Sequence, residues 1–318
     1  MRIDVHAHYY PAALSELMER VLGTPQRNRS LQVMPGFSLH VPVEGQLELM
    51  DGAGIDRMVM SLGNTPPYNE DPNKACELAK GFNDLYVDLH TRHPSRFNAF
   101  IGVPLPHVDA ALQELDRALA LPGVVGLGLG ASVLNQPLDD PAFDPFFAEL
   151  DRRRTVTFIH PLGMGGQLNS EDFGLAWMVG SRFEDTIAMA RLILSGLTLR
   201  YPNIRFIIPH LGGTLTLFLQ RMDNVALRQG WQQRHGTNLK PSDLACRFWV
   251  DTVSEQHSAL RCACETFGVS QLMLGTDWPM LAPEMLKHFV DYIPEALSPD
   301  DATTILERNA AQLLGIEE

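Results

Sequence analysis

The sequence predicts a (β/α)8 barrel, or TIM barrel, an α/β fold in which eight parallel strands alternate with helices. Eight short runs rich in branched and aromatic residues alternate with longer helical patterns along the 318 residues. These runs are mostly apolar, as expected for parallel strands covered by helices. An open doubly wound sheet is the alternative. It is disfavoured because no GxGxxG follows the first run and because eight strands favour closure.

Each expected strand is a short apolar run bounded by turn residues. In chain order the expected strands cover residues 2–6, 56–61, 97–103, 124–129, 156–160, 204–209, 248–251 and 271–275.

Helical patterns with start and stop residues fill the intervals between the strands. Asp71 and Pro72 begin a helix that ends before Pro94, and Pro141 directly follows a capping Asp140. The expected helices cover residues 43–54, 71–94, 107–121, 140–154, 181–202, 212–230, 254–268, 282–293 and 298–315.

No change in composition marks a linker, so we expect a single domain over residues 1–318. Residues 24–43 and 163–180 show no clear period and are predicted to be insertions after the first and fifth strands. Insertions at this end of a barrel lie beside the active site, because the loops that follow the strands form its rim.

Composition and charge exclude several classes of partner. The net charge of -13 argues against nucleic acid and anionic membrane, which both require a concentrated basic surface. No apolar run approaches the roughly 20 residues of a membrane span. The first residues lack the basic and long apolar regions of a signal peptide, so we expect a cytoplasmic protein with reduced cysteines.

Polar residues that end the expected strands predict a metal site. His6 and His8 are two residues apart and therefore point to one face of the first strand. His160, His210 and Asp277 follow the fifth, sixth and eighth strands. Three or four nitrogen and oxygen ligands with an open water position are typical of a catalytic zinc-like site.

Two of these residues have more than one possible role. His210 is either a further metal ligand or an acid/base, and we favour the acid/base role because glycines after it allow close approach of a ligand. Asp277 can bind metal through one oxygen and accept a proton through the other. Arg221 follows His210 by eleven residues, roughly 16 Å along a helix, so it is either a surface residue or serves a neighbouring subunit.

Four short motifs follow the first, fifth, sixth and eighth strands: His6-x-His8, His160-Pro161, His210 with Gly212-Gly213, and Gly275-Thr276-Asp277-x-Pro279. Together they resemble the amidohydrolase superfamily. The similarity is greatest to the branch that contains 2-amino-3-carboxymuconate-6-semialdehyde decarboxylase, γ-resorcylate decarboxylase and 6-methylsalicylate decarboxylase. It extends over nearly the whole chain.

The resemblance implies roles for individual residues. It implies one divalent metal ion bound by four side chains: His6, His8, His160 and Asp277. Zinc is favoured over manganese because the first ligand is histidine, where some relatives have glutamate. His210 would be the catalytic acid/base, alongside Asp277. Arg221 stands where the aminocarboxymuconate enzymes place an arginine that reaches the adjacent subunit's substrate, which implies a homodimer or a higher homo-oligomer.

The sequence also departs from the family pattern. No lysine follows the fourth strand, where hydrolytic relatives often carry a carbamylated one, so a binuclear hydrolase is disfavoured. The leading hypothesis is metal-dependent, non-oxidative decarboxylation of a small hydroxyaromatic or muconate-type carboxylic acid. Hydrolysis of a lactone, an ester or a C–C bond uses the same ligands and is the alternative, and a catalytically silent metal-binding protein is the third.

The substrate itself is not specified by these motifs. Aromatic residues of the two insertions are candidates for an apolar wall around the substrate or for lid packing: Phe37, Phe173 and Trp177.

Overall fold

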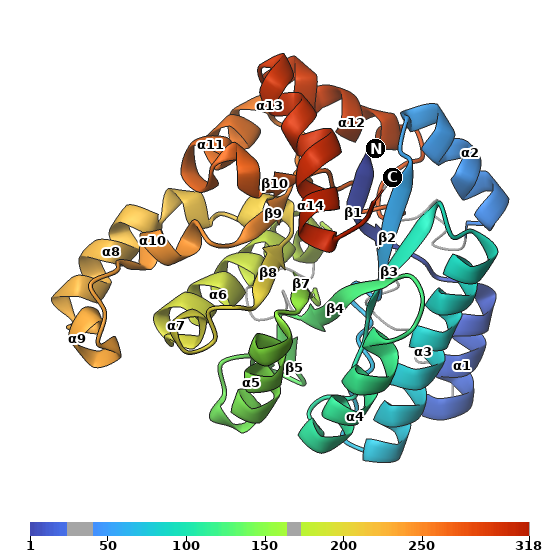
Figure 1. Cartoon of the computed structure of the whole chain (residues 1–318), viewed down its shortest axis with the longest axis horizontal. Coiled ribbons are helices and arrows are strands. Elements are labelled where there is room, and N and C mark those ends of the chain that lie inside the picture. Colours follow the sequence, from blue (N-terminus) through green and yellow to red (C-terminus); the bar gives the residue numbers. More distant parts are fainter. Residues whose placement is uncertain (24–40, 164–172, 318) are drawn as a thin grey trace.

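The computed structural model describes residues 1–23, 41–163 and 173–317. Its main sheet has eight parallel strands in the order β1-β2-β3-β4-β7-β8-β9-β10. They form a nearly closed barrel with helices around it (Figure 1). This arrangement confirms the predicted (β/α)8 fold. The barrel strands are β1 (Ile3–His8), β2 (Arg57–Ser61), β3 (Phe97–Ile101), β4 (Val124–Gly130), β7 (Val156–His160), β8 (Arg205–Ile208), β9 (Trp249–Asp251) and β10 (Leu272–Met273).

Helices occupy the intervals between the strands. The α-helices are α1 (Ala12–Leu22), α2 (Val43–Ala53), α3 (Pro72–Arg92), α4 (Val108–Leu119), α5 (Asp144–Arg153), α6 (Ser181–Leu194), α7 (Leu197–Arg200), α8 (Leu219–Arg228), α9 (Trp231–His235), α10 (Pro241–Ala245), α11 (His257–Phe267), α12 (Met285–Ala296), α13 (Pro299–Thr303) and α14 (Asn309–Leu314). Short 3-10 helices are η2 (Pro141–Phe143), η5 (His210–Gly212), η6 (Leu215–Leu217) and η7 (Val269–Gln271). Two π-helical turns are η4 (Ala176–Gly180) and η8 (Thr304–Arg308), and the hairpin after β4 consists of β5 (Ser132–Val133) and β6 (Gln136–Pro137).

Several boundaries differ from those expected from the sequence. The helix expected over 181–202 is broken at Gly196, whose backbone is left-handed with φ +75° and whose absent Cβ would lie 2.4 Å from the His235 ring. The helix expected over 212–230 begins only at Leu219, because left-handed residues after β8 impose two 3-10 turns first. Helix α1 was not predicted, and β1 continues to His8.

The apolar core has two layers. Inside the barrel, side chains of the strands form one cluster that includes Phe100, Phe158 and Met273, and Leu313 of α14 packs against it. A larger cluster lies between the strands and the surrounding helices. This is the packing expected of a barrel whose interior is filled by side chains and contains no open pore.

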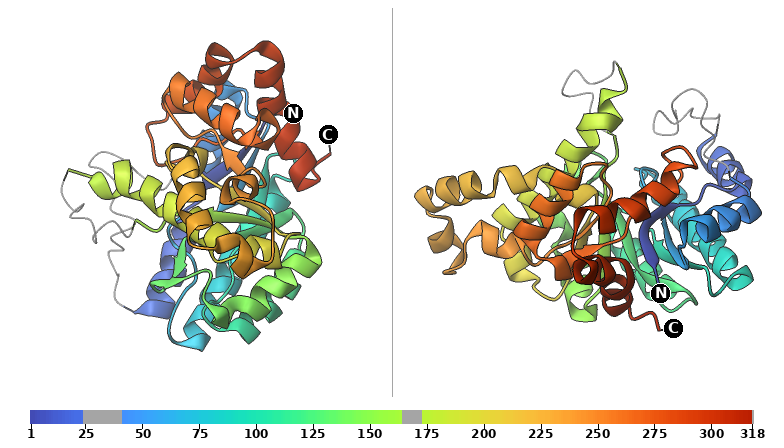
Figure 2. Two further views of the ribbon diagram at one scale, coloured as in Figure 1. Left: turned by 90° about the vertical axis from the view of Figure 1, so that its left-hand side faces the viewer. Right: turned by 90° about the horizontal axis from the view of Figure 1, so that it is seen from above.

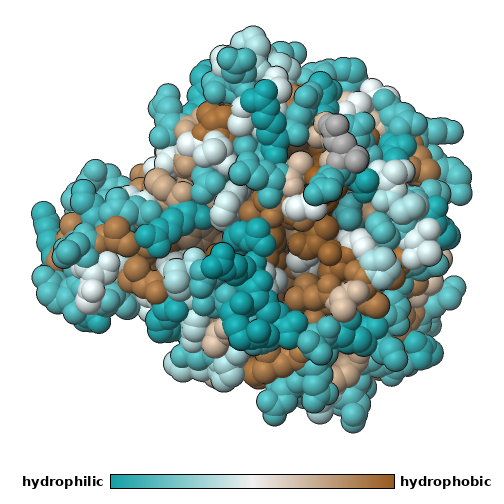
Figure 3. Space-filling view, viewed as in Figure 1, coloured by the Kyte–Doolittle hydropathy of each residue, from teal (hydrophilic) through white to brown (hydrophobic). Residues whose placement is uncertain are grey.

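Both termini lie on one side of the barrel, whereas η4 and the start of α6 project from the opposite side (Figure 2). The face seen in Figure 1 is mostly hydrophilic, with apolar residues gathered around a hollow over β4 and β7 (Figure 3). Of the two predicted insertions, residues 24–40 and 164–172 lie outside the described residues, and so does Phe37. None of the described helices has the length and apolarity needed to cross a membrane.

Candidate metal centre

The first and last strands meet at the centre of the candidate site. The amide of Asp277 donates to the His6 carbonyl at 2.8 Å, and the amide of His8 donates to the Trp278 carbonyl at 2.7 Å. Below them the buried carboxylate of Asp4 accepts hydrogen bonds from the Thr276 amide (3.2 Å) and hydroxyl (2.5 Å). These bonds hold the segment after β10 against β1, so that the Asp277 carboxylate lies over both histidines.

Four side chains converge there from three places along the barrel rim. The ligand atoms of this set all lie within 4.8 Å of one another: His6, His8, His160 and Asp277. Oδ1 of Asp277 lies 3.0 Å from His6 Nε2, 3.1 Å from His8 Nε2 and 4.0 Å from His160 Nε2. The three imidazoles are buried, and the carboxylate is slightly exposed.

The other nitrogen of each imidazole has a fixed partner. His6 Nδ1 lies 2.6 Å from Asp251 Oδ2, His160 Nδ1 lies 2.7 Å from the Pro161 carbonyl, and His8 Nδ1 lies 3.0 Å from Ser61 Oγ. Carboxylate and carbonyl oxygens accept, and the Ser61 carbonyl also lies 3.3 Å from His8 Nδ1. In each neutral imidazole Nδ1 therefore carries the proton and the Nε2 lone pair faces the centre. Gly63 allows this approach, since a Cβ there would lie 2.8 Å from the His8 ring.

Electrostatics at the centre favour a cation. Burial alone would lower the pKa of His6, but the carboxylates of Asp277 and Asp251 raise it to about 10. Burial would likewise raise the pKa of Asp277, yet His6, His160 and His210 hold it well below its ordinary value. Burial lowers the pKa of His160 to about 3, so this imidazole is neutral. The centre therefore attracts positive charge: a bound cation would take the place of the His6 proton, and the neutral imidazole of His160 offers its lone pair.

The buried Nε2 atoms of His6 and His160 have no hydrogen-bond partner among the described residues, although both point at the Asp277 carboxylate. Leaving two buried acceptors unpaired is costly unless a ligand pairs them. Once His6 has released its proton, the three imidazoles and the one carboxylate are a ligand set for a single divalent cation. The residue of β4 level with His160 is Gly130, so β4 offers no side chain there for a second metal.

His210 stands beside this set. Its Nε2 lies 3.4 Å from Asp277 Oδ2, on the other carboxylate oxygen from the one that faces the three imidazoles. His210 and Leu211 both have left-handed backbones, with φ of 55° and 56°. Such conformations persist in residues other than glycine only where the surroundings hold them, and they concentrate at active sites. Here the Asp251 carboxylate holds the turn by accepting from the His210 amide at 2.7 Å.

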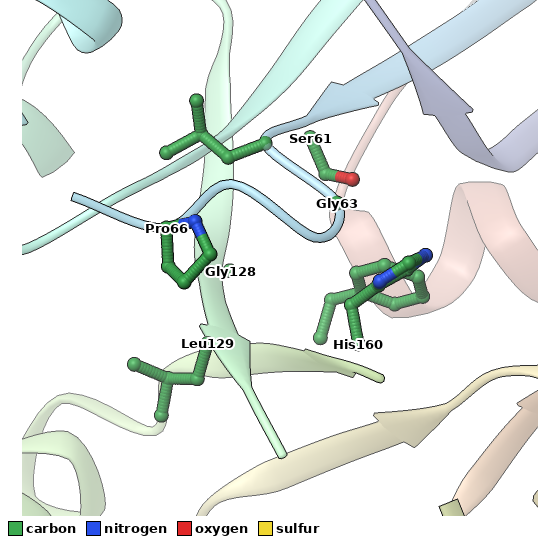
Figure 4. Close-up of a pocket in the computed structure, with 8 residues that line it drawn as sticks. Ser61, Gly63, Pro66, Gly128, Leu129 and His160 are labelled. Carbon is green, nitrogen blue, oxygen red and sulfur yellow. The ribbon is translucent and has the colours of Figure 1, made fainter. Parts of the chain in front are cut away.

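A small pocket opens next to His160. Its lining comprises Ser61, Leu62, Gly63, Pro66, Gly128, Leu129, Phe158 and His160. Pro66 and Leu129 lie on one side of it, and Ser61 and His160 lie on the other (Figure 4). The wall away from the histidine is apolar.

Comparison with known proteins agrees with this geometry. The model of a family described as amidohydrolase matches residues 3–316. The chain belongs to the amidohydrolase family. It is 30% identical over 292 residues to γ-resorcylate decarboxylase of Rhizobium radiobacter, covering 84% of this chain and 83% of that protein. It is 28% identical over 262 residues to 2-amino-3-carboxymuconate-6-semialdehyde decarboxylase of Dictyostelium discoideum, covering 79% and 70%.

A solved relative has the same fold. This amidohydrolase superposes with a TM-score of 0.82 on a dihydroxybenzoic acid decarboxylase from Polaromonas sp. JS666, solved with bound manganese and the inhibitor 2-nitroresorcinol. The two chains are 22% identical, and the match covers 100% of this chain and 97% of that one. The resemblance inferred from the histidine motifs is therefore confirmed at the level of family and fold.

The remaining predicted site residues lie farther out in the amidohydrolase. Arg221 is exposed on α8 and makes no hydrogen bond or ion pair with the described residues. Trp177 packs over Gly163, where a Cβ would lie 2.4 Å from the indole ring, so it reaches the loop that follows β7. Phe173 is 88% exposed. The roles of these three residues stay predictions.

Two buried carboxylates at the site, those of Asp251 and Asp185, were not predicted from the sequence. Asp251 ends β9, and the strand expected over 248–251 ended on it, so the rule that identified the histidines also indicates this residue. Asp185 lies on the inner face of α6, 2.7 Å from His210 Nδ1. An acidic residue within an amphipathic helix is ordinarily solvated, and no pattern in the sequence distinguishes this one.

Replacing His160 with alanine removes one of the four ligands. We expect H160A to bind well below one equivalent of zinc or manganese, because three ligands remain and the Nε2 lone pair is gone. Metal analysis after gel filtration measures this, with His257→Ala on the surface of α11 as the control that keeps its metal. Full metal content in H160A would contradict the proposed ligand set.

Asp251→Asn tests the support of His6. The asparagine side chain has only one oxygen. If that oxygen accepts from the His210 amide, the NH2 group faces Nδ1–H of His6, and a change of tautomer would then protonate Nε2. If the oxygen faces His6 instead, the His210 amide loses its acceptor. We expect about 10- to 100-fold weaker metal binding by calorimetry. Unchanged affinity would show that Asp251 has no part in orienting His6.

Proposed function

We propose that this amidohydrolase is a metal-dependent, non-oxidative decarboxylase of a small hydroxyaromatic or muconate-type carboxylic acid. The observation that carries the proposal is the position of His210. Its imidazole lies 3.4 Å from the free side of the Asp277 carboxylate, next to a centre for one cation and an apolar-walled pocket. The γ-resorcylate and aminocarboxymuconate decarboxylases similar to this chain support the choice of reaction.

The reaction requires a proton at one carbon. That carbon of the substrate ring carries the carboxylate; the proton adds there, the C–C bond breaks, its electron pair returns to the ring and CO2 leaves. A divalent metal held by the four ligands would act as a Lewis acid toward the substrate's oxygens. His210 Nε2 and Asp277 Oδ2 are the two groups of this chain placed to hold and deliver the proton. The apolar wall formed by Leu62, Pro66 and Leu129 would keep the ring in place and exclude water.

For the metal we propose zinc, with manganese as the alternative. Three imidazoles favour a borderline metal such as zinc, while the Polaromonas decarboxylase contains manganese. Hydrolysis of a lactone, an ester or a C–C bond is the competing function, since one carboxylate and one imidazole beside a cation can also activate water. The apolar pocket and the glycine at the end of β4 count against it.

The decisive test is a substrate panel with the metal-loaded protein. We expect CO2 release from at least one hydroxyaromatic acid, among them 2,6-dihydroxybenzoate and 6-methylsalicylate, and no cleavage of lactones or esters. His210→Ala should retain its metal and lower kcat by about 100- to 10,000-fold, the range for loss of a general acid/base. Lactone or ester hydrolysis without any CO2 would overturn the proposal in favour of a hydrolase.

We also propose that the protein assembles at least as a homodimer through the outer face of α6 and α8. Eight of the ten exposed large apolar side chains of the described residues lie on η4, α6, η6 and α8 or at their ends: Met178, Val179, Phe183, Ile187, Leu194, Leu217, Phe218 and Val225. Leu217 is 73% exposed and Ile187 is 58% exposed. Monomeric proteins rarely expose contiguous apolar patches of this kind, and a second copy turned by a two-fold axis covers both patches at once.

Arg221 lies within this face, four residues from both Leu217 and Val225. A guanidinium without a partner among the described residues is suited to bind a carboxylate brought from outside the subunit. We propose that it reaches the substrate carboxylate in the neighbouring subunit, and that Trp177 adds to the wall of the site. Phe173 is proposed as a substrate contact on the same insertion.

Co-expression of two inactive variants tests the role of Arg221 in trans. If Arg221 serves the neighbour, the mixed dimer of R221A and H210A contains one complete site, and random assembly restores about one quarter of wild-type activity. The pair H210A and H160A gives no restoration, because each lesion disables its own subunit. Full activity of R221A alone, or no recovery in the mixture, would contradict the proposal.

Leu217→Asp tests the face itself. A carboxylate buried in an apolar interface is strongly disfavoured, so we expect L217D to sediment as a monomer in analytical ultracentrifugation. Leu134→Asp is the matched control, because Leu134 is an exposed leucine in the β5–β6 turn and belongs to none of the elements of the proposed face. A stable dimer of L217D would show that assembly uses another surface.

A further inference from the structure

The imidazole of His210 contacts a second carboxylate, that of Asp185, which is not one of the four candidate metal ligands. His210 Nδ1 lies 2.7 Å from Asp185 Oδ2, while its Nε2 faces Asp277 at 3.4 Å. Asp185 is fully buried on the inner face of α6, with 0% of its surface exposed. The imidazole ring thus lies in line between a buried carboxylate and the reacting side of the site.

The backbone alone does not determine how this ring is turned. His210 lies in a left-handed turn between Pro209 and Gly213, and rotation of the ring about its outer torsion leaves that turn unchanged. Asp185 provides the hydrogen-bond partner of Nδ1 in the described structure. Burial raises the pKa of the Asp185 carboxyl, while the neighbouring His210 lowers it. In its ionised form the carboxylate only accepts, so it assigns the proton to Nδ1 and leaves Nε2 directed at Asp277.

Helix α6 is fastened to the turns around the site at three consecutive residues. Glu184 accepts from the amides of Leu162 and Gly163, after β7, at 3.0 and 2.9 Å. Asp185 contacts His210, after β8. The Thr186 hydroxyl accepts from the Thr214 amide at 2.8 Å.

Close approach of the backbone at Gly213 to α6 sets the distance between Asp185 and His210. A Cβ at Gly213 would lie 2.4 Å from the Arg182 carbonyl and 2.5 Å from Thr186 Oγ1. Glycine at this position therefore lets the turn press against α6. The separation between Asp185 and His210 is set by packing of backbone on backbone, which makes it reproducible.

The second oxygen of Asp185 distinguishes it from an ordinary structural carboxylate. Oδ1 is buried and has no hydrogen-bond partner among the described residues. Asp223, a buried carboxylate elsewhere in the chain, has both oxygens paired, with the amide and hydroxyl of Ser242 at 2.9 and 2.7 Å. A half-satisfied buried carboxylate costs stability, and such groups call for an explanation beyond stability.

We propose that Asp185 is a positioning residue that holds His210 in the orientation and tautomer needed to move a proton at Nε2. This rests on the proposed function, since it assigns the proton transfer to His210. The arrangement follows the general rule that an imidazole acting at one nitrogen is oriented by a partner on the other. Asp185 itself touches neither substrate nor metal ligand.

Kinetics of Asp185→Leu test the proposal. Leucine preserves the volume but removes the acceptor, so we expect kcat to fall on the order of 100-fold, with KM and metal content unchanged. Asp185→Asn keeps an amide oxygen that can accept from Nδ1–H and should retain more activity than D185L. Asp223→Asn is the structural control, for which we expect a lower Tm and an unchanged kcat.

A double-mutant cycle separates positioning from stability. If Asp185 acts only through His210, D185L has no further effect on kcat in the H210A background. An equal loss in both backgrounds would overturn the proposal, because it would show that Asp185 stabilises the site independently of the imidazole.

A spectroscopic measurement decides the question without turnover. In the zinc-loaded protein labelled with 15N-histidine, two-bond 1H–15N spectra identify the tautomer, and the His210 signals are those missing from H210A. We expect an Nδ1–H tautomer in the wild type and in the asparagine variant, and a shift toward Nε2–H in D185L. An unchanged tautomer in D185L would overturn the proposal. If the wild type releases no CO2, the proposed function fails while these spectra still decide the role of Asp185.

Discussion

The site depends on the junction between the first and last strands. β10 is only two residues long, and the chain beyond it is held to β1 by backbone bonds at His6 and His8 and by the buried pair of Asp4 and Thr276. Burial raises the pKa of the Asp4 carboxyl to about 7, because the pair of Asp4 and Thr276 is shielded from water. These bonds between β1 and the segment after β10 determine where Asp277 lies, with φ of 57° in the left-handed region. Without these bonds the barrel would still hold three imidazoles, but nothing would bring the carboxylate to them.

Each ligand owes its direction to a different neighbour around the barrel. Asp251 of β9 orients His6, Ser61 of β2 orients His8, and the carbonyl after β7 orients His160. The partners are themselves buried or part of the backbone, so rotation of any imidazole breaks a hydrogen bond that water cannot replace. The centre is therefore rigid before any ligand arrives, which is the condition under which electrostatic stabilisation of a transition state is effective.

The sequence was sufficient for the barrel and for the polar residues that gather at its rim, because both follow from strand periodicity, whereas the choice of four ligands among those residues followed from the family resemblance. Alternating runs define the strands, and the ends of parallel strands share one rim, so polar residues that end the runs must meet. Asp251 obeys the same rule, since it ends β9, but it was not among the predicted site residues. The role of Asp185 could not be predicted from strand ends. Asp185 is buried because α6 packs closely on the turn after β8. That close packing depends on Gly213 and Thr186, and it produces no periodic pattern in the sequence. The break at Gly196 was hidden for the same reason, since it depends on contact with a distant histidine.

Helix α6 joins the two proposals. Its inner face carries Asp185 and the buried Met189 and Leu192, while its outer face exposes Phe183 and Ile187. The helical period places these faces on opposite sides of one rigid element. A second subunit that packs on the outer face therefore presses on the helix that positions His210. Assembly and proton transfer then share one structural element, and a dimer would bring Arg221 from outside while holding the imidazole from behind.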